Sequence, residues 1–190
     1  MLNHLKIVEI LISLQCIFIS TMIPVFFSIP FLNGGKYNLE IPITWQIPSI
    51  ILISIIFKKN IVLTAHTIYI LLGLFILPIF HQGGSIGYLL TPNFGYLIGI
   101  YPLIIIIDKL NKKNKIFVFE FLKTGVLAIS SMHITGILYN LLQIIFYKQT
   151  SIFLYNLGKY SIGKIGYHLL MLIPLALLIK PISYLKYKKQ

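Results

Sequence analysis

Six long apolar stretches, separated by short polar breaks, dominate the pattern of hydrophobic and polar positions along the chain. A helix needs ~20 mostly apolar residues to cross the hydrocarbon core of a bilayer. We therefore predict an all-α integral membrane protein with six transmembrane helices. The expected spans cover residues 7–27, 41–57, 61–80, 88–107, 116–147 and 165–182.

Prolines mark where the first two spans bend or end. Pro24 lies near the end of the first apolar stretch, and a loop rich in turn residues follows over 28–40. The second stretch contains Pro42 and Pro48. We expect this span to begin at the membrane interface near Trp45 and to bend in its middle, because proline removes a helix hydrogen bond.

The later breaks differ in their polarity. The break over 81–87 carries no formal charge. Residues 116–147 are apolar for longer than one membrane thickness, and we expect one long helix there. A polar connection is expected over 148–164, which contains Gly158 and Gly163, before the last span.

Composition limits the chain to one kind of domain. Hydrophobic residues make up 57% of the 190 residues and charged residues only 11%. This leaves almost nothing for a separate aqueous domain, so residues 1–190 are expected to form a single membrane domain. Glu9 and Gln15 interrupt the first apolar stretch, which favours a retained helix over a signal peptide.

The basic residues predict the orientation of the chain in the membrane. All sixteen are lysines, they face four acidic residues, and the net charge is +12. Eleven lysines lie in breaks on the side of the termini and four on the other side, which predicts that both termini are cytoplasmic, or stromal in a plastid. Nucleic-acid binding is disfavoured because no aromatic-basic platform lies outside the spans.

Amino-acid usage bears on the host membrane. The chain has no arginine, abundant isoleucine and only three alanines. This usage is typical of an AT-rich genome, and it favours a bacterial plasma membrane or a plastid membrane. The single cysteine, Cys16, lies inside an apolar run and cannot form an intrachain disulfide.

Several polar side chains lie inside the expected spans, where burial in lipid is costly. Three of them are histidines, His66, His133 and His168, and each would contact a ligand, relay a proton or form a hydrogen bond between helices. The hydrogen bond is favoured for His66. For His133 and His168 the choice between these roles stays open. Asn140 and Gln143 lie three residues apart and share a helix face, which points at protein or at a cavity rather than at lipid.

Enzymatic chemistry finds little support in the sequence. Ser131 and His133 lack a Gly-x-Ser-x-Gly elbow and a partnered acid. No metal-ligand spacing and no Walker A motif occur, and the four acids are too scattered for a paired-carboxylate site. We expect no enzymatic activity, no bound metal and no cofactor.

The segment over 83–99 is the most informative part of the sequence. It reads Gly-Gly-Ser-Ile-Gly-Tyr-Leu-Leu-Thr-Pro-Asn-Phe-Gly-Tyr-Leu-Ile-Gly, so it places glycines, a proline, an asparagine and tyrosines at membrane depth. Irregular backbone is tolerated there only where it is buried in protein or lines a cavity. This segment predicts a ligand site.

Together with Ile41-Pro42-Ile43-Thr44-Trp45-Gln46 and the stretch 71–80, this segment resembles the BioY family, the biotin-binding S components of energy-coupling-factor transporters. The resemblance implies a six-helix protein with an externally open pocket that binds one vitamin and does not pump alone. It also implies docking on a transmembrane coupling subunit with two ATPases. Cys16 and Ser20 would form the docking face, where alanines are usual in the family.

One departure from the family concerns the contacts to biotin. The family commonly ends in Pro-Gly-Asp-x-x-Lys, whereas the matching stretch here is Ile165-Gly166-Tyr167-His168-Leu169-Leu170-Met171. The ligand carboxylate would then use Lys164 or a backbone amide, and the ureido ring would use amide or imidazole groups. The resemblance and the polar pattern give these candidate ligand-binding residues: Gln82, Gly83, Gly84, Tyr88, Asn93, Tyr96, Asn140 and His168.

Two functional hypotheses follow. The first is a substrate-binding membrane component for uptake of biotin or a related small vitamin, energised by a separate ATPase module. The alternative is a non-transporting membrane assembly or interaction protein that keeps the fold without binding biotin. The missing acid and lysine favour the alternative, while the polar and glycine-rich segment over 83–99 favours binding.

Overall fold

The computed structural model describes residues 4–29, 37–80, 83–113, 115–147 and 150–188. Within these ranges the chain is helical apart from one two-stranded hairpin and short connections. The helices are α1 (His4–Met22), α2 (Gln46–Ile56), α3 (Lys59–Phe75), α4 (Pro92–Asn111), α5 (Val118–Tyr147), α6 (Thr150–Asn156), α7 (Gly163–Leu170) and α8 (Leu172–Lys188). A 3₁₀ turn, η1 (Ile86–Leu90), precedes α4, and a π-helical turn, η2 (Leu157–Ile162), joins α6 to α7.

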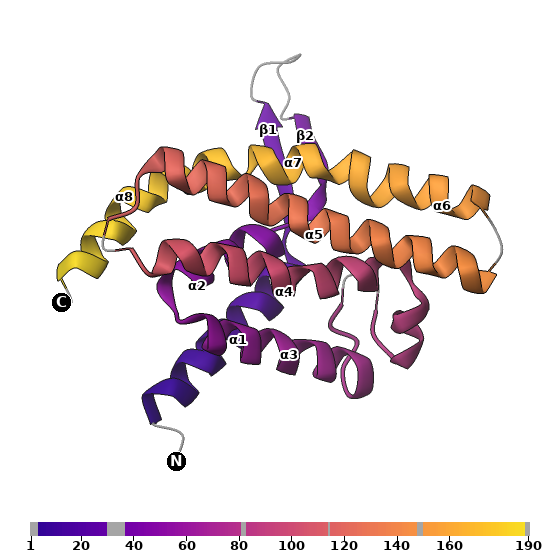
Figure 1. Cartoon of the computed structure of the whole chain (residues 1–190), viewed down its shortest axis with the longest axis horizontal. Coiled ribbons are helices and arrows are strands. Elements are labelled where there is room, and N and C mark those ends of the chain that lie inside the picture. The colour runs from indigo at the N-terminus through magenta and orange to yellow at the C-terminus, as the bar shows by residue number, and fades with distance from the viewer. Residues whose placement is uncertain (1–3, 30–36, 81–82, 114, 148–149, 189–190) are drawn as a thin grey trace.

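The last four helical elements form one helical run. Only Met171 separates α7 from α8, and its amide donates a helix-like hydrogen bond to the Tyr167 carbonyl at 3.1 Å. Counted this way, the described helices group into six, which confirms the predicted all-α class. Figure 1 shows α5 and the C-terminal run side by side along the length of the molecule.

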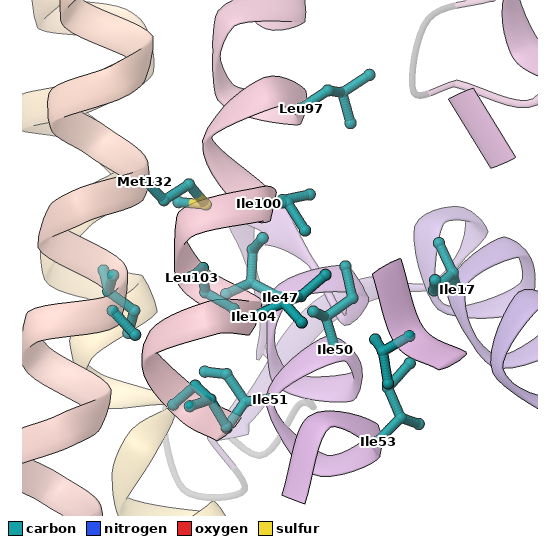
Figure 2. Packing of buried hydrophobic residues seen from close by; sticks show 14 of the residues in the cluster. Ile17, Ile47, Ile50, Ile51, Ile53, Leu97, Ile100, Leu103, Ile104 and Met132 are labelled. Atoms are coloured by element: carbon teal, nitrogen blue, oxygen red, sulfur yellow. The ribbon is translucent and has the colours of Figure 1, made fainter. Parts of the chain in front are cut away.

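Helix α4 lies at the centre of the packing, against both α2 and α5, while α1 packs on α2 and α3. The core between α2 and α4 consists of branched aliphatic side chains (Figure 2). Such residues fill space without buried polar atoms, so they hold the helices by close packing. The main contributors are Ile47, Ile50, Ile51, Ile100, Leu103 and Ile104.

Glycines let α4 and α5 approach closely. A Cβ on Gly99 would lie 2.5 Å from the Met132 carbonyl oxygen of α5, and a Cβ on Gly136 would lie 2.5 Å from the Tyr96 ring. Both contacts are too short for any side chain larger than hydrogen. Small residues at helix crossings are a common packing device in membranes.

The structure contains a β-hairpin that was not predicted from the sequence. Strand β1 (Pro24–Ile29) pairs antiparallel with β2 (Tyr37–Thr44), with a register irregularity between Pro24 and Val25. The first helix was predicted to reach residue 27 but ends at Met22, because Pro24 cannot continue a helix and β-branched or aromatic residues follow it. The apolar residues of β2 alternate with other residues, as in a half-buried strand.

The second and fourth helices also begin later than the predicted spans. Residues 41–44 pair in β2, so α2 begins at Gln46 rather than at 41. Tyr88 lies in η1, and α4 starts at Pro92, since proline is suited to the first turn of a helix. Within the described ranges, four helical stretches are long and apolar enough to span a membrane: 4–22, 92–110, 118–145 and 151–182.

The polar connection predicted over 148–164 is helical where it is described, from Thr150 onward. Its two glycines do not end the helix, because a helical glycine costs only about 1 kcal/mol relative to alanine. The glycines instead accompany the π-helical turn. The predicted last span, 165–182, therefore belongs to a longer helical stretch.

Large apolar side chains cover much of the outer surface of the helices. Phe119 is 77% exposed, Leu177 76% and Ile145 71%. In water such exposure would be unfavourable, whereas in a bilayer these side chains meet lipid. The surface therefore agrees with a chain that crosses a membrane several times.

Candidate functional site

A cavity of about 510 Å³ lies between the hairpin, residues of α2, α3, α4 and α5, and the C-terminal helical run. This volume is within the usual range for small-molecule sites. Its wall combines apolar and aromatic side chains with a few polar groups. The lining residues are Pro24, Ile41, Pro42, Ile43, Thr44, Gln46, Ile47, Tyr69, Phe80, Tyr88, Asn93, Tyr96, Leu97, Ile100, Met132, Lys159, Tyr160, Lys164 and His168.

The hairpin and the start of α2 form one wall. Val25, Ile41 and Ile43 are buried against Met171, which anchors the hairpin on the C-terminal helical run. Thr44 and Gln46 follow directly in the chain and line the cavity. The wall is therefore held by an apolar cluster of its own, separate from the main core.

Three aromatic rings form a second wall. Tyr69 and Phe80 meet edge to face with centroids 5.4 Å apart, and Phe80 and Tyr88 are tilted at 4.5 Å. The Tyr69 hydroxyl lies 3.3 Å from the Ile79 carbonyl oxygen, to which it donates. These aromatic pairs fix the ring positions and give the cavity a rigid, largely apolar surface.

A chain of hydrogen-bonded polar side chains reaches the cavity at both of its ends. The Tyr96 hydroxyl lies 2.7 Å from Ser161 Oγ, and Ser161 Oγ lies 3.2 Å from His133 Nδ1. His133 Nε2 lies 3.1 Å from His168 Nδ1. Because Tyr96 and His168 both line the cavity, hydrogen bonds tie two cavity-lining side chains together through buried Ser161 and His133.

Two lysines give the cavity a positive charge. Lys159 and Lys164 lie on the C-terminal run, and their ammonium nitrogens are 5.4 Å and 5.3 Å from the centroid of the Tyr160 ring. None of the described lining residues is an aspartate or glutamate. The arrangement can bind a small molecule that carries an apolar body and an anionic group.

The structure places half of the predicted ligand-binding residues on this cavity: Tyr88, Asn93, Tyr96 and His168. Asn140 is instead buried in α5, where its amide donates to the Gly136 carbonyl at 3.0 Å. Gln82 lies outside the described residues.

Gly83 and Gly84 are not among the residues that line the cavity. Gly83 has φ of +117°, which favours glycine, and its amide donates to the Phe80 carbonyl at 3.0 Å. A Cβ on Gly84 would lie 2.6 Å from the Gly73 carbonyl oxygen. Both glycines shape the turn after α3, which positions Phe80 and Tyr88.

The predicted docking pair faces the chain's own helices. Ser20 is buried, its hydroxyl donates to the Ile17 carbonyl at 3.1 Å, and Cys16 is half-buried against the core. In this structure the buried Ser20 faces the chain's own helices, and docking of a partner on Cys16 and Ser20 stays a prediction. Small residues at these positions serve the contact of α1 with α2 and α3, as small residues do at many helix crossings.

Sequence reasoning missed several lining residues, including Thr44, Gln46, Tyr69 and Tyr160. Thr44 and Gln46 did lie in the segment that carries the family resemblance, and they precede an apolar stretch that contains a proline. Tyr69 and Tyr160 had no comparable signal, because a tyrosine in an apolar helix is common in cores and interfaces. Only the packing of distant elements brings these residues together.

These features define a class: a polytopic helical membrane protein with a cavity for a small molecule. Comparison with known proteins narrows the class. The model of the BioY family matches residues 3–178, so the chain belongs to the BioY family.

One curated relative and one solved structure are similar to this chain. The relative is a probable biotin transporter BioY from Lysinibacillus sphaericus, 42% identical over 59 residues. That match spans 31% of this chain and 30% of the relative. The structure is the S-component for biotin from an ECF-type ABC transporter, which superposes with a TM-score of 0.59 at 18% identity over 95% of both chains. At this identity the likeness shows a shared fold.

Proposed function

We propose that this protein is the substrate-binding membrane component of a biotin uptake transporter. The membership of the BioY family and the names of its similar proteins support biotin as the ligand. In this proposal the protein binds biotin without chemical change. A separate coupling subunit with ATPases supplies the energy, as in an ECF-type transporter.

The observation that carries the proposal is the cavity of about 510 Å³ and the chemistry of its wall. Biotin has an apolar fused ring system with a ureido group, and a flexible chain that ends in a carboxylate. Aromatic rings at Tyr69, Phe80 and Tyr88 suit the ring system, because buried aromatic surface contributes strongly to binding. Asn93 carries both donors and an acceptor, which suits the ureido group.

The alternative, an assembly protein without a ligand, has less support. A protein that kept only the fold has no need of an open interior cavity, since protein interiors without a ligand are close-packed. Here Asn93, Tyr96 and His168 all line one cavity. We therefore favour ligand binding.

Thermal unfolding of the detergent-purified protein across a panel of vitamins tests the proposal. A ligand at a hundredfold excess over its dissociation constant stabilises the native state by about 2.7 kcal/mol. Biotin is expected to raise the unfolding temperature, with thiamine and riboflavin as controls that leave it unchanged. A response to another vitamin and none to biotin would contradict the proposed substrate.

A further inference from the structure

The π-helical turn η2 is a feature of the cavity wall that the proposed function leaves unexplained. At its end, the Gly163 amide donates to the Gly158 carbonyl, five residues earlier in the chain. Turns of this kind are rare within α-helices and frequently occur at functional sites. Here the turn lies in the part of the helical run that contributes Lys159, Tyr160 and Lys164 to the cavity.

The π-helical turn changes which side chains share a face. In a regular α-helix, two residues five positions apart point about 140° away from each other, because each residue turns by about 100°. The π pattern bonds residues five apart, so it brings positions such as 159 and 164 toward the same side. The ammonium nitrogens of Lys159 and Lys164 accordingly lie 5.4 Å and 5.3 Å from one ring centroid, that of Tyr160.

Among the side chains that the structure describes, neither of these lysines has an acidic partner at the cavity. The ion pairs of the described residues join Lys112 to Asp108 and Lys113 to Glu120, far along the chain from the π-helical turn. Two ammonium groups near one ring repel each other, and the ring compensates only in part through cation–π attraction. An anionic group placed beside them would offset this repulsion.

We propose that η2 forms a two-lysine clamp for the carboxylate of the ligand, and that the clamp selects anionic ligands over their neutral counterparts. The inference rests on the proposed function, because it assigns a role within the same cavity. Lys164, which is half-buried, holds the carboxylate directly. Lys159, which is exposed, attracts the anion at the cavity mouth, where salt screens its charge.

Binding of biotin and of biotin amide, its uncharged counterpart, tests the clamp by titration calorimetry of the full chain. The wild-type protein is expected to prefer biotin, and Lys164→Gln is expected to weaken biotin binding about tenfold to a hundredfold. The same change should leave the affinity for biotin amide within about twofold of the wild-type value. Hydrogen bonds to charged groups contribute more free energy than hydrogen bonds between neutral groups. Lys180→Gln, at an exposed lysine outside the cavity lining, is the matched control and should change neither affinity.

Lys159→Gln separates attraction at the mouth from direct contact. Its effect on biotin binding is expected to be several-fold at low salt and to fade as the ionic strength rises past about 0.15 M. The effect of Lys164→Gln should persist at that salt concentration. If Lys159→Gln leaves biotin binding unchanged at low salt, the clamp has one lysine rather than two and the proposal is wrong.

Replacement of two glycines at the π-helical turn tests whether the turn itself is needed for biotin binding. A Cβ on Gly163 would lie 3.0 Å from the Gly158 carbonyl oxygen, which accepts the π-type hydrogen bond, whereas a Cβ on Gly158 would meet nothing within 4 Å. Gly163→Ala is therefore expected to weaken biotin binding about tenfold, and Gly158→Ala is expected to change it little. Equal effects of both replacements would overturn the role of the turn.

The outcomes distinguish the clamp from the proposed function. If the folded wild-type protein binds neither biotin nor its amide, the proposed function fails and the clamp fails with it. If the wild-type protein binds biotin and Lys164→Gln still prefers biotin over the amide to the same degree, the clamp alone is wrong. Loss of that preference in Lys164→Gln supports both.

Discussion

His133 of α5 and His168 of α7 are joined by a hydrogen bond, with Nε2 of the first 3.1 Å from Nδ1 of the second. Both side chains are buried, and Ser161 contacts the remaining nitrogen of His133 at 3.2 Å. His133 is thereby fixed on both sides. Since His168 lines the cavity, this bond determines how its ring is presented to a ligand.

Replacement of His133 tests this positioning role. His133→Leu leaves His168 Nδ1 without this partner and removes one of the two hydrogen bonds of Ser161 Oγ, which is expected to cost about 1 to 3 kcal/mol of stability. Biotin affinity should fall about tenfold through the misplaced His168 ring, as judged by titration of protein that is still folded. His4→Leu, at an exposed histidine in the first turn of α1, is the control. If His133→Leu leaves the affinity for biotin unchanged, the hydrogen bond from His133 does not position His168 for ligand binding.

Asn93 is expected to contact the ligand directly. Asn93→Leu removes two donors and one acceptor from the cavity wall, so the affinity for biotin should fall about tenfold to a hundredfold. Thermal stability without ligand should change little, and Asn60→Leu in the exposed first turn of α3 serves as the control. A loss of stability with an unchanged dissociation constant would show instead that Asn93 only supports the start of α4.

Gly99 is expected to be essential for the packing of α4 on α5. Gly99→Ala places a Cβ 2.5 Å from the Met132 carbonyl oxygen, so the helices must separate. Overpacking of this kind costs about 1 to 3 kcal/mol, which should appear as a lower unfolding temperature in detergent. Gly166→Ala, where a Cβ meets nothing within 4 Å, should leave that temperature within experimental error. Equal temperatures for both variants would contradict the described crossing.

The hydrophobic pattern was sufficient for the fold class but not for the hairpin. Long apolar stretches predict helices well, because each can satisfy its own backbone hydrogen bonds in a membrane. Residues 24–29 are equally apolar, and their pairing with 37–44 depends on contacts beyond the local sequence, such as Ile43 with Met171. Local pattern alone cannot distinguish a short buried strand from the end of a helix.

The site was predictable only in part, for a related reason. Tyr88, Asn93 and Tyr96 were found because a polar, proline-containing segment at membrane depth is unusual. The partners of His133 depend on the π-helical turn, which places Ser161 beside it. The sequence of that turn, with two glycines and lysines nearby, predicted a loop instead.

The orientation of the chain remains a prediction from its lysines. In a Cys16→Ser background, a cysteine at Gly87 is expected to react with an impermeant thiol reagent added outside, and one at Lys112 to be protected. Gly87 is a suitable probe because a Cβ there meets only Ser85 Oγ at 3.4 Å, and the Lys112 side chain is 73% exposed. If the cysteine at position 112 is labelled from outside and the cysteine at position 87 is protected, the chain has the opposite orientation.

Titration of the purified full chain with biotin shows whether the cavity binds this vitamin. We expect saturable binding of one biotin per chain, because a cavity of about 510 Å³ suits one such molecule. The Asn93→Leu and Lys164→Gln variants should each bind more weakly while unfolding at nearly the wild-type temperature. An absence of saturable biotin binding by the folded wild-type protein would contradict the proposed function.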